Sequence, residues 1–106
     1  MPRLGDCVLK GASGTAYSMK VYAGSTRFND FIPGVFVIAK MKGDDVRALY
    51  LGESDNVDPA LSKHPRRADF ESAGFDRILF LRNADKSTRE AVVSDLTTAL
   101  KPELAD

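Results

Sequence analysis

Residues 34–52, with the sequence GVFVIAKMKGDDVRALYLG, decide the fold of this chain. Two mainly apolar runs, 35–39 and 47–51, lie on either side of a turn of lysine, glycine and aspartate at 42–45. Short apolar runs that flank such a turn are typical of two antiparallel strands joined as a hairpin. Gly52 follows the second run directly and is expected to end that strand.

Two further stretches extend this β structure. After the turn GASG, polar and apolar residues alternate, which places three side chains on one face of a strand: Tyr17, Met19 and Val21. Residues 6–10 and 16–22 are therefore expected to form an N-terminal hairpin. The apolar run at 77–81 predicts the third strand of a central sheet.

Two short helices are expected between the second and third strands of that sheet. Asp58 can accept hydrogen bonds from free amide groups and Pro59 suits the first helical position, so a helix is predicted to start there. Pro65 stops this helix, because proline cannot continue one. A second helical segment at 68–73 is closed by Gly74.

A longer helix is predicted near the end of the sequence. Ser87 and Glu90 have the spacing of a capping box, which opens a helix over 88–100, and Pro102 closes it. The predicted class is therefore α+β: a three-stranded antiparallel sheet flanked by helices, with an extra N-terminal β-hairpin. The predicted core consists of Val35, Val37, Leu49, Leu51, Leu61, Ile78, Phe80, Val92, Leu96 and Leu100.

Length and composition are those of one globular domain. A chain of 106 residues that is 43% hydrophobic and 28% charged is neither collagen-like nor disordered. A single cysteine excludes an internal disulfide. The sequence also has no apolar run that resembles a signal peptide or is long enough to cross a membrane. Together with the single cysteine, this predicts a cytoplasmic protein with no membrane association. Fifteen basic and fifteen acidic residues cancel, so binding to nucleic acid is expected to be weak.

Several short motifs follow one another in an order found in a nuclease family. In chain order they are Gly34-Val35-Phe36, Tyr50-Leu51-Gly52, Asn56-Val57, His64, Glu90 and Pro102. Over about residues 33–102 the sequence resembles the GIY-YIG nuclease superfamily. Residues 1–32 are expected to be an N-terminal hairpin extension of this one domain, which spans 1–106.

The resemblance carries implications for chemistry. Members of the superfamily cut phosphodiester bonds with one divalent metal ion held by a helix glutamate. By resemblance, Tyr50, His64 and Glu90 are implied as catalytic residues, with Glu90 as the ligand of Mg²⁺ or Mn²⁺. Gly34, Gly52 and Asn56 are implied at the substrate. A local basic cluster around Pro65 suits a phosphate group or an acidic partner; its members are Lys63, Arg66 and Arg67.

Three departures from the family pattern predict impaired catalysis. Ala60 stands where the family's arginine is expected, and Phe36 lacks the hydroxyl group of a tyrosine. The loop after the second central strand carries three carboxylates that repel a polyanion: Glu53, Asp55 and Asp58. We therefore expect a nuclease-like binding or regulatory module rather than an enzyme.

Other interpretations stay open at this point. Arg66 or Arg67 could take the place of the missing arginine, which would give an active metal-dependent endonuclease. Alternatively, this chain could be a non-enzymatic protein. The edge of its N-terminal hairpin would then pair with a strand of a protein partner or of a second copy of the chain. The site residues also have simpler roles: Glu90 in a helix cap, His64 beside a helix end, and Tyr50 as a half-buried strand residue.

Overall fold

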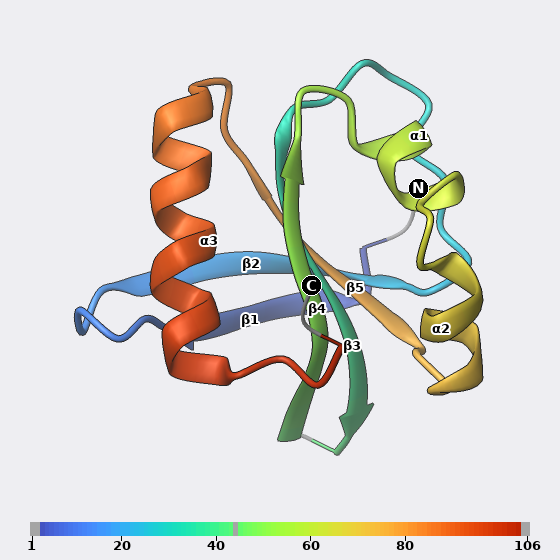
Figure 1. Ribbon diagram of the computed structural model, residues 1–106, viewed down its shortest axis with the longest axis horizontal. Coiled ribbons are helices and arrows are strands. Elements are labelled where there is room, and N and C mark those ends of the chain that lie inside the picture. The colour runs from blue at the N-terminus through green and yellow to red at the C-terminus, as the bar shows by residue number, and fades with distance from the viewer. Residues whose placement is uncertain (1–2, 44, 105–106) are drawn as a thin grey trace.

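The computed structural model describes residues 3–43 and 45–104 and contains a curled five-stranded antiparallel sheet. In chain order the elements are β1 (Gly5–Lys10), β2 (Ala16–Ala23), β3 (Gly34–Lys42), β4 (Asp45–Ser54), α1 (Val57–Ser62), α2 (Arg67–Ser72), β5 (Arg77–Arg82) and α3 (Lys86–Leu100). The strand order across the sheet is β1-β2-β5-β3-β4. In Figure 1, β1 and β2 cross the direction of β3 and β4, and β5 runs between the two pairs. The predicted α+β class is confirmed.

The central hairpin forms from the stretch that opened the sequence analysis. β3 pairs with β4 along its whole length, from Gly34 opposite Ser54 to Lys42 opposite Asp45. Gly43 has a φ of 62° in the turn, a conformation that glycine adopts without steric cost. Asp44, which also belongs to the predicted turn at 42–45, lies outside the described residues.

The N-terminal hairpin is part of the same sheet. β2 pairs with β5, with Lys20 opposite Phe80 and Ala23 opposite Arg77, so the three predicted central strands are joined by two more. Asp95 of α3 also holds the β1–β2 turn: its carboxylate accepts hydrogen bonds from the Ser13 amide at 2.8 Å and from the Tyr17 hydroxyl at 2.7 Å. The hairpin is therefore integrated with the rest of the domain.

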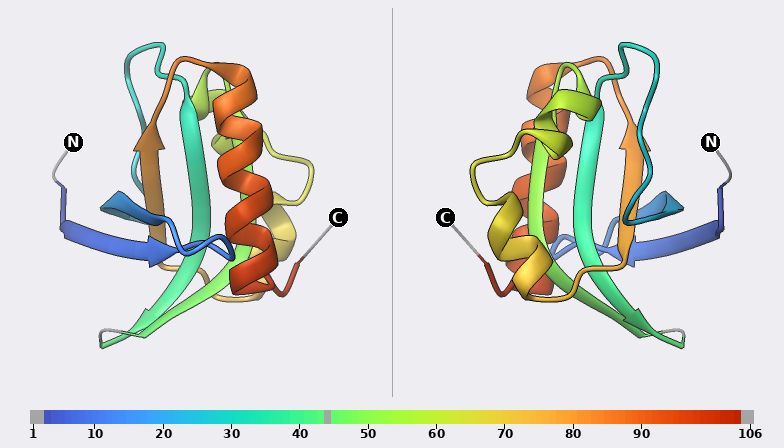
Figure 2. Two further views of the ribbon diagram at one scale, coloured as in Figure 1. Left: turned by 90° about the vertical axis from the view of Figure 1, so that its left-hand side faces the viewer. Right: turned by 90° about the vertical axis from the view of Figure 1, so that its right-hand side faces the viewer.

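Helices cover both faces of the sheet, α3 on one and α1 and α2 on the other (Figure 2). The α3-side cluster includes Leu9, Met19, Val35, Val37, Leu51, Leu79, Val92 and Leu96. The α1–α2-side cluster includes Phe28, Phe36, Ile38, Leu49, Tyr50, Val57, Leu61, Phe70, Ile78 and Phe80. Every residue of the predicted core is buried except Leu100, which is only partly buried and packs against the α3-side cluster.

The start of α3 differs from the prediction. Asp85, not Ser87, is the N-cap, and its carboxylate accepts hydrogen bonds from the Thr88 amide and the Ser87 hydroxyl, both at 2.9 Å. The Thr88 hydroxyl also donates to this carboxylate, at 2.6 Å, and that bond, followed by the other two, lowers the pKa of Asp85. The predicted capping box between Ser87 and Glu90 is therefore wrong, because Asp85, two residues before Ser87, caps the helix instead and accepts from the Thr88 amide.

The start of α1 also differs. The helix begins at Val57 with Asn56 at the N-cap position, so Asp58 lies inside its first turn. Asp58 does not cap the helix; it accepts hydrogen bonds from Arg27 and from the Phe28 amide in the loop between β2 and β3. Its partners lie far away in the sequence, and local spacing could not reveal them.

Among the described residues, no helix has the length and apolar character needed to cross a bilayer.

Candidate functional site

Tyr50 and His64 lie together in an aromatic cluster beneath α1 and α2. Their ring centroids are 4.9 Å apart, and Phe70 of α2 contacts both rings, at 5.2 Å from Tyr50 and 5.0 Å from His64. His64 lies after the end of α1, in the connection to α2, and its Nδ1 accepts a hydrogen bond from the Arg66 amide at 3.0 Å. Nδ1 is therefore the unprotonated nitrogen of that ring.

A β-bulge puts Tyr50 on this face of the sheet. Ile38 pairs with Tyr50 and Ala39 pairs with Ala48, so Leu49 is an extra residue with no partner directly opposite. One inserted residue reverses the alternation of side chains beyond it. Leu49 and Tyr50 consequently both face α1 and α2, whereas Ala48 and Leu51 face α3.

Glu90 lies on the other side of the molecule. It is exposed on α3, which packs on the α3-side cluster, while Tyr50 and His64 belong to the opposite face of the sheet. The structure therefore does not bring together Tyr50, His64 and Glu90, the three residues that the resemblance implies as catalytic. No group of three histidine, cysteine or acidic side chains that could hold a metal ion occurs within residues 3–43 and 45–104. These side chains do not fit a metal centre shared with Tyr50 and His64.

The two motif glycines make room for aromatic rings. A Cβ atom on Gly52 would lie 2.6 Å from Cζ of Phe36, the residue directly opposite on β3. A Cβ atom on Gly34 would lie 2.3 Å from Cε1 of Phe80 and 2.5 Å from the carbonyl oxygen of Leu81. Both glycines therefore have a packing role, and Phe36 fills space above Gly52.

Arginines neutralise the acidic loop. Arg89 of α3 is 1% exposed; it donates to Glu53 at 2.8 Å and to the Asn83 carbonyl at 3.1 Å, and it also pairs with Asp55. The hydrogen bond with Glu53 raises the pKa of Arg89. The repulsion expected from three unpaired carboxylates is thus reduced. Arg89 is not among the residues predicted from the sequence, although it lies three residues before Val92 on the apolar stripe of α3.

The two arginines of the basic cluster around Pro65 form ion pairs and other contacts within the fold. Arg66 pairs with Asp69 at 2.8 Å and donates to the Leu104 carbonyl at 3.1 Å. Arg67 pairs with Glu71 at 3.3 Å, and its guanidinium group lies 4.9 Å from the centre of the Phe75 ring. Lys63 is exposed. Neither arginine lies near Glu90, because α1 and α2 cover the face of the sheet opposite α3.

Asn56, the remaining motif residue, makes no side-chain cap for α1. Its Oδ1 atom is buried and has no hydrogen-bond partner among the described residues. Asn56 lies on the loop between β4 and α1, and its backbone amide donates instead to the Ser54 hydroxyl at 3.0 Å. The structure therefore places Asn56 in a local turn with Ser54.

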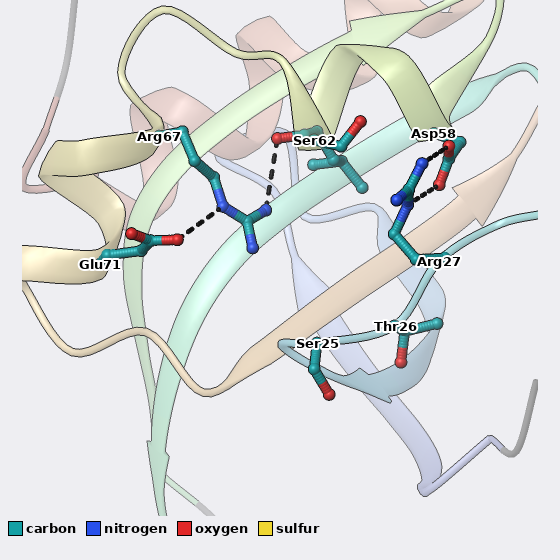
Figure 3. A pocket seen from close by; sticks show the side chains of 8 residues that line it. Ser25, Thr26, Arg27, Asp58, Ser62, Arg67 and Glu71 are labelled. Carbon is teal, nitrogen blue, oxygen red and sulfur yellow. Dashed lines mark hydrogen bonds and ion pairs between the residues drawn. The ribbon is translucent and has the colours of Figure 1, made fainter.

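A polar pocket of ≈ 250 Å³ lies between α1, α2 and the loop that joins β2 to β3 (Figure 3). Its polar lining is formed mainly by Ser25, Thr26, Arg27, Asp58, Ser62 and Arg67. Figure 3 shows Arg67 reaching from α2 and Arg27 reaching from the loop, so that their guanidinium groups flank the pocket. The sequence analysis assigned Arg67 to a basic patch but did not identify Arg27.

Each pocket arginine is held by a carboxylate. Arg27 donates from Nε and Nη2 to Asp58 at 2.8 and 2.6 Å, a bidentate pair that lowers the pKa of Asp58 to about 2 and raises the pKa of Arg27. Arg67 donates from Nε to Glu71 and from Nη1 to the Leu61 carbonyl, both at 3.3 Å. Within the described residues, Nη1 of Arg27 and Nη2 of Arg67 have no hydrogen-bond acceptor.

Comparisons with known proteins found no match to this chain among family models, curated proteins or solved structures.

Proposed function

We propose that this chain is a nuclease-like binding module without hydrolytic activity, and that the pocket between Arg27 and Arg67 receives a phosphate-like anion. One observation carries the binding proposal. Two guanidinium groups, each oriented by a carboxylate, leave Nη1 of Arg27 and Nη2 of Arg67 available in one pocket. Planar guanidinium groups bind phosphate oxygens with well-directed hydrogen bonds.

The lining around the arginines supports the same ligand. Ser25, Thr26 and Ser62 contribute hydroxyl groups that can donate to further oxygens of the anion. Asp58 and Glu71 offset the two positive charges, so recognition depends on directed N–H and O–H donors rather than on net charge. Modest affinity follows, in keeping with a chain whose formal net charge is zero.

The separation of Tyr50 and His64 from Glu90 supports the absence of hydrolysis. A transition state in phosphoryl transfer needs its stabilising groups around one set of oxygens. Here the aromatic pair lies under α1 and α2 while Glu90 is exposed on α3. The resemblance to GIY-YIG nucleases would then concern architecture and not activity.

Binding is tested by following backbone amide signals in NMR titrations with inorganic phosphate and, separately, with a short single-stranded oligonucleotide. We expect shifts at Ser25, Thr26 and Ser62, and Arg27→Gln should weaken binding by about tenfold, the cost of losing charge-assisted hydrogen bonds. Arg47→Gln is the matched control, because Arg47 is 60% exposed and pairs with Glu103 much as the 65% exposed Arg27 pairs with Asp58.

Equal loss of binding in both variants, or no shift at the pocket amides, would overturn the proposed site. Shifts with phosphate alone would identify a small anion as the ligand, and tighter binding of the oligonucleotide would identify nucleic acid.

Hydrolysis is tested with supercoiled plasmid in Mg²⁺ or Mn²⁺, where no cleavage is expected. Cleavage that disappears in Glu90→Ala would instead support the active endonuclease.

A further inference from the structure

We propose that two copies of this chain associate through β1, with the two β1 strands antiparallel and a two-fold axis at Val8. The surface concerned, called here the β1 edge, consists of Asp6, Val8 and Lys10. It is separate from the pocket between Arg27 and Arg67, so this proposal stands independently of the proposed ligand. Three observations carry it: an uncovered strand edge, the direction of its backbone groups and the order of its side chains.

The two edge strands of the sheet, β4 and β1, differ in how far other backbone covers them. At the β4 end, the amides of Glu103 and Leu104 donate to the carbonyl groups of Ala48 and Leu49, at 3.2 and 2.7 Å, and cover part of the strand. At the other end, β1 pairs only with β2 in the part of the chain that the structure describes. Uncovered edge strands are the usual place where a further strand is added to a sheet.

The backbone of the β1 edge points outward. The Gly24 amide donates to the Asp76 carbonyl at 2.9 Å in continuation of the β2–β5 pairing, so the even-numbered residues of β2 bond toward β5. Because bonding direction alternates along an antiparallel strand, Tyr17, Met19 and Val21 bond toward β1. Their partners are Leu9, Cys7 and Gly5, which leaves the N–H and C=O groups of Asp6, Val8 and Lys10 directed away from the sheet.

Side chains on the β1 edge complement a second copy in one register. With Val8 opposite the second copy's Val8, each Asp6 lies opposite a Lys10. Directly opposed unlike charges stabilise an antiparallel pair, and like charges destabilise it. If one strand shifts by two residues, Val8 lies opposite a charged residue. If it shifts by four residues, Asp6 lies opposite Asp6 or Lys10 opposite Lys10. In a parallel pair of strands, Asp6 would lie near the Asp6 of the second copy. The sequence therefore favours the two-fold arrangement over its alternatives.

Apolar exposure and surrounding charge agree with this arrangement. Val8 is 64% exposed, one of the large hydrophobic side chains that the fold leaves in solvent, and pairing would cover it. The charged groups facing Asp6 within its own chain are Arg3, at 3.8 Å between exposed side chains, and Lys20, opposite on β2. A zero formal net charge leaves no general repulsion between copies.

The test is sedimentation equilibrium of the whole chain over a concentration series at low salt. One paired strand buries little area, so we expect a dimer that dissociates on dilution. Asp6→Lys and Lys10→Asp should each raise the dissociation constant by about tenfold, because each places like charges opposite one another. The double variant Asp6→Lys with Lys10→Asp should restore the wild-type value.

Asp30→Lys provides the matched control, since Asp30 is exposed in the loop between β2 and β3 and the substitution changes the net charge as Asp6→Lys does. It should leave the dissociation constant unchanged. Hydrogen exchange gives a second readout: the amides of Asp6, Val8 and Lys10 should exchange more slowly as concentration rises, while that of Leu9 should not change. A monomer at all concentrations, or a double variant no better than the single ones, would overturn the proposal.

Discussion

Gly34 and Gly52 show how one residue type can carry two interpretations. In the sequence they belong to motifs that imply contact with a substrate. In the structure each lies against an aromatic ring of a neighbouring strand, Phe80 for Gly34 and Phe36 for Gly52. Their neighbours differ in one respect: the three atoms nearest to a Cβ on Gly34 include the backbone carbonyl oxygen of Leu81, whereas the three nearest to a Cβ on Gly52 all belong to the Phe36 side chain.

This difference predicts unequal effects of an added methyl group. Gly34→Ala should lower the free energy of unfolding by roughly 3 kcal/mol, because a backbone carbonyl within a sheet cannot move aside. Gly52→Ala should cost roughly 1 kcal/mol, because the tip of the Phe36 ring can turn away. Urea unfolding followed by circular dichroism measures both values.

Gly5→Ala is the control, because a Cβ atom on Gly5 would meet nothing within 4 Å. It should leave stability within about 0.5 kcal/mol of the wild type. Equal costs at Gly34 and Gly52 would show that the Leu81 carbonyl yields as readily as a side chain.

At the scale of elements, Arg89 joins the first turns of α3 to the end of β4. Its guanidinium group is buried, and its ion pair with Glu53 is also largely shielded, whereas Asp55 is mostly exposed. Removing one member of a buried ion pair leaves the other charge without compensation, which is more costly than removing both. Arg89 therefore adds a buried polar link between α3 and β4 to the apolar packing of Val92 and Leu96.

We expect Arg89→Met to lower the melting temperature by on the order of 10 °C, since it preserves bulk but leaves Glu53 uncompensated. Combining it with Glu53→Gln should recover part of the loss. Asp55→Asn should have little effect, because that pair lies at the surface. Thermal melts of the four proteins supply the measurement, and a double variant less stable than Arg89→Met would contradict this account.

At the scale of the whole molecule, the N-terminal hairpin and the central strands belong to one sheet and share the α3-side cluster. β2 pairs with β5, and Met19 is fully buried in the α3-side cluster beside Leu96. Asp95 adds polar contacts between α3 and the hairpin turn. A hairpin attached in this way cannot melt alone without exposing the cluster beneath α3.

Met19→Ala should therefore destabilise the whole domain, by about 2–5 kcal/mol, as expected when a buried methionine is truncated. Unfolding should remain a single transition, with the same midpoint by far-ultraviolet circular dichroism and by tyrosine fluorescence. Two separate transitions, with the hairpin lost first, would show instead that residues 1–32 are an independent extension.

By itself, the sequence determined the strands, their antiparallel hairpins and most of the core. Period-two alternation and the turns around Gly14 and Gly43 are local signals, and the strand pattern placed Val37, Leu51 and Ile78 in the interior correctly. The α+β class followed from the order of these elements.

Only the tertiary structure decided what the candidate site residues do. The bulge at Leu49 turns Tyr50 away from α3, and the pairing of Arg27 with Asp58 and of Arg89 with Glu53 joins residues 31 and 36 positions apart. A bulge depends on how two strands pair, and an ion pair depends on how distant segments fold together. Neither leaves a periodic trace in the sequence, because local patterns specify which face of an element is buried and not what that face meets.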